Sequence, residues 1–105
     1  MIVDVESPPG MVCVGFRAMA DETRLRALAF LAEGERCVCD IADYLDVPQP
    51  LLSHHLRVLR EAGLVTLRRE GRWSHYAINK TAFDDLHDAV VMGLHADTGS
   101  EACGC

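Results

Sequence analysis

The sequence predicts a mainly α-helical domain that carries one two-stranded β-hairpin. Three observations predict this class. Apolar residues recur at helical spacing in several segments, glycine or proline bounds these segments, and two short alternating runs flank the dipeptide Glu70-Gly71. At 105 residues, half of them apolar, the chain has the size and composition of one folded domain. A domain this small buries only about two-thirds of its unfolded surface, so dimer formation would stabilise it.

Two helices are expected in the first third of the chain. The first covers residues 11–20. Asp21 suits the N-cap of the second, because its carboxylate can accept a hydrogen bond from a free backbone N–H group. Gly34 suits the end of that helix. We expect its buried stripe to consist of Leu25, Leu28, Ala29 and Ala32.

A short helix and a longer one are expected next, separated by a proline-containing turn. The short helix covers residues 40–45 and would pack through Ile41, Tyr44 and Leu45. Proline disfavours a helix interior but suits a helix entrance, so the longer helix is expected from Pro50 to Ala62. Gly63 stops it. Its apolar face consists of Leu52, Leu56 and Leu59.

The segment LVTLRREGRWSHYAI predicts a β-hairpin that turns near Glu70-Gly71. Asn79 or Thr81 then caps a last helix. Its inward face is expected to consist of Phe83, Leu86, Val90 and Leu94. This order of elements is that of a helix-turn-helix followed by a two-stranded wing. We expect a domain of residues 11–96 between flexible segments at residues 1–10 and 97–105.

The charge of the chain is unevenly distributed. The formal net charge is −6, which by itself disfavours a nucleic-acid partner. Between Gln49 and Lys80, however, six basic residues accompany only two acidic ones, whereas residues 1–48 contain nine acidic and four basic residues. A basic face on an acidic body is typical of a protein that binds nucleic acid.

The longer helix and the hairpin carry the residues that we predict to contact DNA. Polar side chains in the first turns of a helix can reach base edges in a major groove, and arginines of a wing can reach the flanking phosphates. The predicted contacts are Gln49, Ser53, His54, Arg57, Arg68, Arg69 and Arg72. The alternative is an amphipathic surface helix followed by a charged hairpin, with no role in DNA binding. This alternative explains the polar helix or the basic hairpin taken singly, but it explains their combination less well. No enzyme is expected, because the sequence shows no nucleophile–base–orienter set and no glycine-rich phosphate loop.

The five cysteines are the second chemical feature. Four of them form the Cys-x-Cys pairs Cys37/Cys39 and Cys103/Cys105, and the fifth is Cys13. The chain begins without a signal peptide and contains no membrane-spanning run, so we expect it to be cytoplasmic. In that compartment clustered thiols favour metal binding or redox sensing over stable disulfides.

The pair Cys37/Cys39 precedes the short helix of the helix-turn-helix. Two residues at i and i+2 point apart within a regular helix. Their sulfurs converge only if Cys37 is still extended and Cys39 lies in the first helical turn. Free backbone N–H groups at a helix N-terminus would lower the pKa of a thiol there, and the thiolate is the form that binds soft ions.

The segments MADETRLRAL, CVCDIA, SHHLRVLREAGLV and REGRWSHY resemble the metal-sensing winged helix-turn-helix repressors of the ArsR/SmtB family. The resemblance covers roughly residues 16–94. It implies a homodimer, built on the first and last helices, that represses an operon by binding an inverted repeat in operator DNA. It also implies that ligand binding releases the DNA.

The CVCD motif resembles arsenic and cadmium/lead sensors, so we expect arsenite or antimonite as the inducer, with cadmium and lead as alternatives. Arsenic(III) takes three thiolates. In many arsenic-responsive members the third cysteine lies three residues beyond the second, but that position here is Ala42. The resemblance makes Cys13, from either subunit, the first candidate for the third ligand, and Cys103 or Cys105 the next. Zinc is less favoured, because the positions of the family's zinc-type site fall on Lys80, Ala82, Gly93 and Ala96.

Two other functions remain open from the sequence. In a thiol redox switch, Cys37 or Cys39 would pair with Cys13 or a tail cysteine on oxidation. A metal-buffering protein would have no DNA role, and the basic stretch 49–80 disfavours it. For a repressor, capture of a ligand by the thiol pair is expected to displace the start of the short helix, and the longer helix would then lose its register on DNA.

Overall fold

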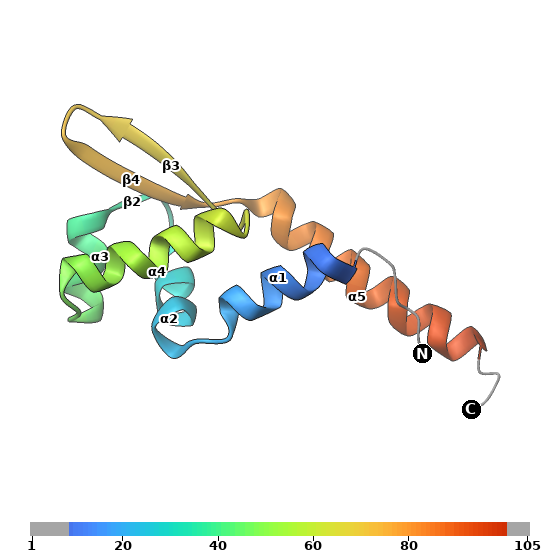
Figure 1. Ribbon diagram of the computed structural model, residues 1–105. Helices are drawn as coiled ribbons and strands as arrows, with labels where there is room; N and C mark the ends of the chain where they lie inside the picture. Colours follow the sequence, from blue (N-terminus) through green and yellow to red (C-terminus); the bar gives the residue numbers. More distant parts are fainter. Residues whose placement is uncertain (1–8, 101–105) are drawn as a thin grey trace.

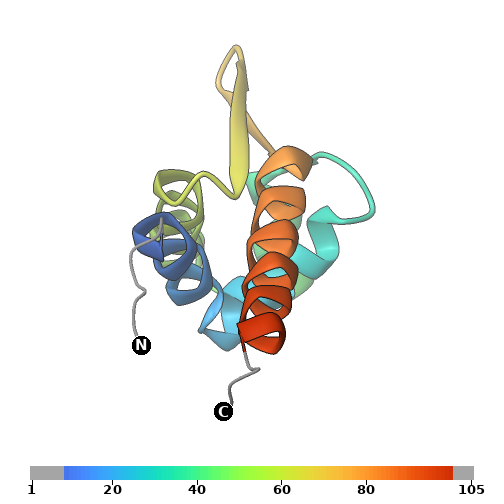
Figure 2. The same cartoon turned by 90° about the vertical axis from the view of Figure 1, so that its right-hand side faces the viewer.

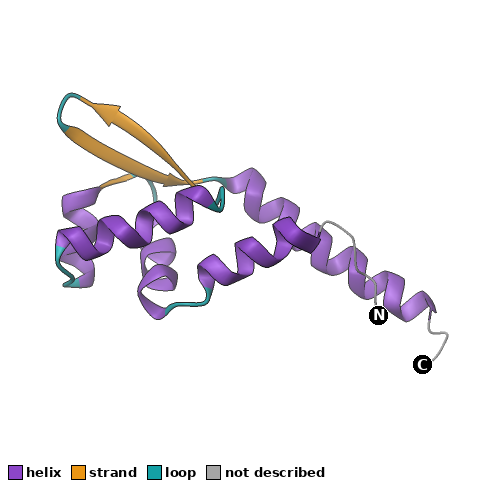
Figure 3. Cartoon of the chain, viewed as in Figure 1, coloured by secondary structure: helices purple, strands orange, loops and turns teal. Residues whose placement is uncertain are grey.

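The computed structural model describes residues 9–100 of the chain, and the side chains of residues 12–92. Helices predominate, and a small sheet extends from one side of them (Figures 1 and 3). The elements in order are α1 (Pro9–Met19), α2 (Glu22–Leu31), β2 (Arg36–Cys37), α3 (Val38–Leu45), α4 (Gln49–Glu61), β3 (Val65–Glu70), β4 (Trp73–Ile78) and α5 (Lys80–Ser100). This order confirms the predicted helix-turn-helix with a β-hairpin wing.

Helix α2 begins as the sequence predicts and buries a different stripe. The Asp21 carboxylate accepts a hydrogen bond from the backbone N–H of Arg24 at 3.1 Å, which confirms the N-cap. The helix ends at Leu31, three residues before Gly34. Its buried residues are Ala27, Leu28 and Leu31, so the predicted stripe is wrong except at Leu28. The face that contains Ala27 and Leu31 is buried because α3 and α4 pack against α2.

Helices α3 and α4 form the centre of the core. Leu52, Leu56 and Leu59 are completely buried, as their spacing predicts. On α3, Ile41 and Leu45 are buried, but Tyr44 is 63% exposed and stacks on Phe30 with ring centroids 4.1 Å apart. Helix α4 begins at Gln49, one residue earlier than predicted, with proline in its first turn. Gly63, in a left-handed conformation with φ of 81°, follows its last turn.

The wing is a three-stranded antiparallel sheet of order β2-β4-β3. The hairpin of β3 and β4 pairs Glu70 with Trp73, so it turns at Gly71, whose φ of 61° suits glycine. The sequence did not predict β2, because two residues are too few to show a strand period. Its pairing matters here, because Cys37 lies directly opposite His75 of β4. One of the two thiols is therefore part of the wing.

Helix α5 follows the wing, and α1 lies beside it in both views (Figures 1 and 2). Asn79 accepts a hydrogen bond from the backbone N–H of Ala82 at 3.4 Å, so Asn79 caps the helix. Phe83 and Leu86 are half-buried as predicted, whereas Val90 is 39% exposed in the single chain. In Figure 1, α5 extends beyond the other elements of the fold. The side chain of Leu94 is outside the described residues.

The helix continues to Ser100, whereas the sequence predicts a flexible tail from residue 97. The other end of the predicted domain also differs slightly, since α1 begins at Pro9. The remainder of the predicted tail, with Cys103 and Cys105, lies outside the described residues. Within the part of the chain that the structure describes, no helix is long and apolar enough to cross a membrane.

Candidate DNA interface and thiol site

A polar groove of about 520 Å³ separates α4 from the wing. Five of the seven residues predicted to contact DNA meet in it: Gln49, Ser53, His54, Arg57 and Arg69. Arg60 lines the same groove and was not among the predicted contacts, although its position on α4, three residues after Arg57, could have indicated it. The groove therefore joins the start of the predicted recognition helix to the wing in one basic surface.

Strand alternation places Arg68 and Arg69 on opposite faces of the wing. Arg69 lines the groove and donates a hydrogen bond to Ser74 Oγ at 3.3 Å. Arg68 donates to the two carboxylate oxygens of Glu35 at 2.8 and 3.1 Å, and it lies 3.5 Å from Glu70. The hydrogen bond from Arg68 holds the pKa of Glu35 below its usual value. The structure thus does not bring Arg68 together with the residues of the groove.

The remaining arginines of the predicted DNA surface are exposed. Arg57 lies 4.0 Å from Glu61 one turn further along α4, and both side chains are about two-thirds exposed. An ion pair of this kind contributes little to stability and leaves the guanidinium free to contact a phosphate. Arg72 is exposed in the turn of the hairpin and does not line the groove.

The adjacent histidines of α4 have different environments. His54 is exposed and lines the groove. The side chain of His55 is only 12% exposed, and its Nδ1 lies 3.1 Å from the guanidinium of Arg24. Arg24 also donates to the carbonyl oxygen of Ala18 at 2.6 Å. His55 is therefore a packed residue, and it links α4 to α2.

Cys37 and Cys39 converge at the start of α3. Cys37 is the N-cap residue, with an extended backbone of φ −75° and ψ 148°, and Cys39 lies in the first turn. The two Sγ atoms lie 2.7 Å apart, and both residues are partly buried. As the sequence analysis requires for the two sulfurs to converge, Cys37 is extended and Cys39 is helical. The local sequence produces it because the chain leaves β2 at Cys37 and enters the helix at Val38.

The pKa of the Cys39 thiol is raised, which is opposite to the predicted effect of a helix N-terminus. The main cause is the hydrogen bond with Cys37, followed by burial and by the charges of Cys37 and Asp40. A hydrogen bond from the backbone N–H acts in the lowering direction but is a smaller effect. The proximity of two sulfurs therefore outweighs the helix terminus, because two thiolates at this distance repel each other.

The third candidate donor, Cys13, is exposed on α1. Among the residues that the structure describes, no three His, Cys, Asp or Glu side chains lie close enough as they stand to hold a metal ion. Within the described residues of one chain, Cys37 and Cys39 thus bring together two soft sulfur donors, which fit an arsenic(III) or borderline metal ion but do not complete its coordination. Cys103 and Cys105 are outside the described residues.

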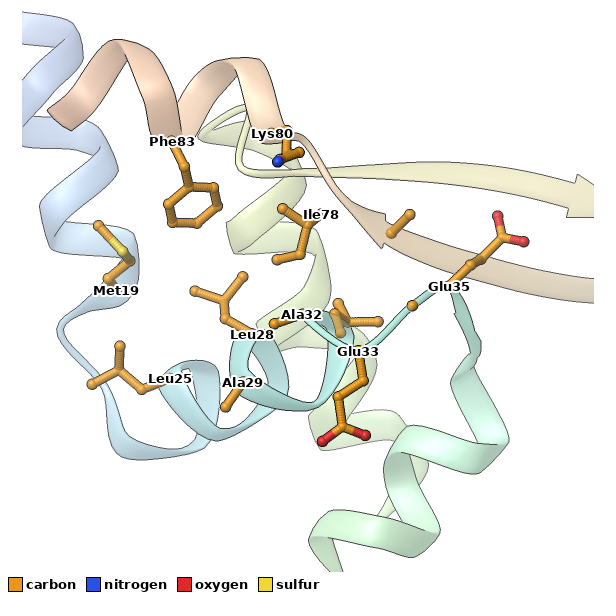
Figure 4. Close-up of a pocket in the computed structure, with 13 residues that line it drawn as sticks. Met19, Leu25, Leu28, Ala29, Ala32, Glu33, Glu35, Ile78, Lys80 and Phe83 are labelled. Carbon is orange, nitrogen blue, oxygen red and sulfur yellow. The ribbon is translucent and has the colours of Figure 1, made fainter. Parts of the chain in front are cut away.

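A larger hollow, of about 670 Å³, lies between α2, β4 and α5 (Figure 4). None of the residues predicted for the DNA surface or the thiol site lines it. Its walls are mainly apolar, and they include Leu25 and Ala29 of α2 and Ala32 directly after it, three residues that the sequence analysis placed in the core. This hollow explains why these residues are more exposed than predicted.

Comparison with known proteins identifies the family. Residues 21–66 match the model described as "Bacterial regulatory protein, arsR family". The arsenical resistance operon repressor of Escherichia coli is 49% identical over 65 residues, which cover 61% of this chain and 56% of that protein. An arsenic resistance transcriptional regulator of Pseudomonas putida is 40% identical over 92 residues, which cover 87% of this chain and 68% of that protein.

A solved structure of similar fold is the homodimeric winged helix-turn-helix DNA-binding domain of a possible ArsR-family transcriptional regulator from Mycobacterium bovis. It is 29% identical to this chain, with a TM-score of 0.67, and the match covers 92% of this chain and 95% of that one. By their names, these relatives are an operon repressor, a transcriptional regulator and the DNA-binding domain of a possible transcriptional regulator. The sequence matches and the common fold lead to the same conclusion: the chain belongs to the ArsR family of bacterial regulatory proteins.

Proposed function

We propose that the chain is a transcriptional repressor that binds operator DNA as a homodimer and releases it when Cys37 and Cys39 capture arsenite or antimonite. The observation that carries the proposal is the 2.7 Å separation of the two sulfurs at the start of α3. Helix α3 comes directly before α4, the helix that lines the proposed DNA groove. The names of the arsenic-resistance relatives support the choice of inducer.

The polar groove between α4 and the wing is the proposed DNA surface. Gln49, Ser53 and His54 lie in the first two turns of α4, where a recognition helix reaches base edges. Arg57, Arg69 and the exposed Arg72 are proposed to contact the phosphate backbone. Such contacts make binding strongly dependent on salt concentration, because each one releases counterions from the DNA.

Two physical connections join the thiols to this surface. The first is the predicted one, since α3 packs against α4 and both are parts of one helix-turn-helix. The second comes from β2, because Cys37 pairs with His75 in the wing. A ligand that draws the two sulfurs toward a third donor would therefore strain both the start of α3 and the edge of the wing sheet. Coupling of this kind is reciprocal and has a typical magnitude of about 1–3 kcal/mol.

The proposal is tested by operator binding in an arsenite titration. Cys37→Ser and Cys39→Ser proteins should bind operator DNA as the unmodified protein does, followed by fluorescence anisotropy, and should not release it at arsenite concentrations that free the unmodified repressor. Thr66→Ala is a matched control, because it removes a small exposed polar side chain of β3 that does not line the groove, and it leaves both thiols in place. Full release of DNA from either cysteine variant would refute the thiol assignment.

The same assay separates the remaining alternatives. A Cys13→Ser protein and a protein with both Cys103→Ser and Cys105→Ser show which cysteine completes the arsenite site. Reversible release by a peroxide, with metal and arsenite absent, would instead favour a redox switch. Release by cadmium or lead at lower concentrations than arsenite would favour the cadmium/lead sensor.

A further inference from the structure

The segment that carries Cys37 is attached to the wing by a very short strand. Strand β2 has two residues, and both pair with β4, Arg36 with Tyr76 and Cys37 with His75. Strand β4 lies between β2 and β3 in the sheet. Through backbone pairing a movement of Cys37 therefore reaches β4, and a direct connection to β3 has to come from side chains.

The ion pair of Glu35 and Arg68 supplies that connection. Glu35 directly precedes β2, two residues before Cys37, whereas Arg68 belongs to β3. Arg68 donates to both carboxylate oxygens of Glu35, from Nη2 at 2.8 Å and from Nε at 3.1 Å. A two-point contact between a guanidinium and a carboxylate fixes the relative orientation of the two groups as well as their distance. The pair thus joins the start of β2 to β3 across the intervening strand.

The neighbouring ion pairs do not make this connection. The pKa of Glu35 is lowered and that of Arg68 is raised, each mainly by the hydrogen bond between them, so both groups are held in their charged forms. Arg68 also lies 3.5 Å from Glu70, but that contact stays within β3. The contact of Glu33 with Arg36, at 3.7 Å, stays within the segment around the start of β2.

We propose that Glu35 and Arg68 are positioning residues of the ligand response, which pass a displacement of Cys37 to β3 and so to the DNA groove. Arg69, the neighbour of Arg68 on β3, lines that groove. The inference rests on the proposed function, because it concerns how ligand capture by the thiol pair weakens the contact with operator DNA. Neither Glu35 nor Arg68 lines the groove or belongs to the thiol pair.

The exposure of the pair separates this role from a purely structural one. The side chains of Arg68 and Glu35 are 52% and 38% exposed. An ion pair this exposed contributes little to the free energy of unfolding. Its loss should therefore leave the fold intact, and it should reduce the factor by which a captured ligand weakens operator binding. A pair with only a structural role would leave that factor unchanged.

Phenylarsine oxide is a suitable probe, because it needs only two thiols and not the third that arsenite takes. Its arsenic(III) forms one bond to each of two sulfurs, both thiols give up their protons, and the oxygen of the reagent leaves as water. The parent protein for the test is the full chain with Cys13→Ser, Cys103→Ser and Cys105→Ser, so that Cys37 and Cys39 are the thiols that react. Mass spectrometry confirms that one reagent is bound per chain.

Fluorescence anisotropy gives the operator dissociation constant of each protein before and after this modification. In the parent protein the modification should raise the constant by about tenfold or more. In Glu35→Gln and in Arg68→Gln, made in the parent protein, the constant before modification should stay within about threefold of the parent value. The increase on modification should be smaller than in the parent by about threefold or more.

Glu33→Gln is the matched control, because it removes the same charge two residues from Glu35 and breaks only the local contact with Arg36. It should respond to the reagent as the parent protein does. The double variant Glu35→Arg with Arg68→Glu restores the ion pair with its charges exchanged, and it should recover the response that the single variants lose. Circular dichroism checks the fold of each protein.

An increase in Glu35→Gln and Arg68→Gln as large as in the parent protein would overturn the inference. An equally reduced response in Glu33→Gln, or no response of the parent protein, would also overturn it. Failure of the proposed function has a different signature. If arsenite does not release the protein with all five cysteines from DNA, while phenylarsine oxide still distinguishes Glu35→Gln from its parent, arsenite is not the inducer and the link through Arg68 remains.

Discussion

Arg68 donates hydrogen bonds to both carboxylate oxygens of Glu35, at 2.8 and 3.1 Å, on the face of the wing that is turned away from α4. Its neighbour Arg69 is on the other face and lines the groove. We therefore expect Arg69→Gln to weaken operator binding and to reduce the slope of log affinity against log salt concentration by about one. Arg68→Gln should have a smaller effect on both quantities.

Fluorescence anisotropy with an operator fragment over a series of salt concentrations measures both effects, and the two variants serve as controls for each other because they remove equal charge from adjacent positions. Equal losses of affinity and slope in the two proteins would show that the DNA backbone contacts both faces of the wing, contrary to this prediction.

Helix α4 contains a second pair of adjacent residues, His54 and His55, whose substitutions should have different effects. His55 is packed against Arg24 at 3.1 Å, whereas His54 lines the groove. His55→Ala should lower the free energy of unfolding by about 1–2 kcal/mol, because it removes a partly buried hydrogen bond to a charged group. His54→Ala should change it by no more than about 0.5 kcal/mol and should weaken operator binding instead.

Urea unfolding followed by circular dichroism gives the first quantity, and anisotropy with the operator fragment gives the second. The reverse pattern, with a stability loss in His54→Ala and none in His55→Ala, would mean that the packed and exposed histidines have been wrongly assigned.

The sequence predicted the helix-turn-helix well because its signals are local. Leu52, Leu56 and Leu59 repeat at helical spacing and are fully buried, and Asp21 and Gly63 mark helix ends through their own backbone chemistry. Convergence of Cys37 and Cys39 could also be inferred, because it required only that the helix begin between them.

The features that the sequence did not reveal depend on distant parts of the chain. The strand β2 has two residues and exists through its pairing with β4, so no local pattern predicts it. The bidentate contact between Arg68 and Glu35 joins segments 33 residues apart and follows from the same pairing. The raised pKa of Cys39, by contrast, has a local cause, because its contact with Cys37 outweighs the lowering effect of the backbone N–H at the helix terminus.

The N-cap of α2 predicts a dependence of stability on pH. The pKa of Asp21 is lowered from its ordinary value of 3.8, mainly because its carboxylate accepts the backbone hydrogen bond of Arg24. A carboxyl group with a lowered folded-state pKa stabilises the protein above its unfolded-state pKa, and this contribution is lost as the pH falls through the folded-state value. Asp21→Asn keeps a hydrogen-bond acceptor for the cap but cannot titrate.

The unmodified protein should therefore be more stable than Asp21→Asn near neutral pH, and the difference should disappear as the pH falls to about 3 and below. Thermal unfolding midpoints of the two proteins, measured over this range at constant ionic strength, provide the comparison. Asp21→Ala, which loses the cap itself, should remain less stable at every pH. A difference between the unmodified protein and Asp21→Asn that did not change with pH would exclude the carboxylate as its source.

The exposed apolar side chains of α1 and α5 predict where two chains associate. Val90 is 39% exposed and Met92 69% exposed on α5, while Val14 and Phe16 on the adjacent α1 are 46% and 45% exposed. The structurally similar domain from Mycobacterium bovis is homodimeric. Val90→Lys should shift the protein toward the monomer, because burial of an unpaired charge at an apolar interface is unfavourable. Asp88→Lys changes an exposed position two residues away, on another face of the helix, and should leave the dimer intact.

Sedimentation velocity over a range of protein concentrations distinguishes a monomeric Val90→Lys protein from a dimeric Asp88→Lys protein. A stable dimer in Val90→Lys together with a monomer in Asp88→Lys would place the interface on the other face of α5.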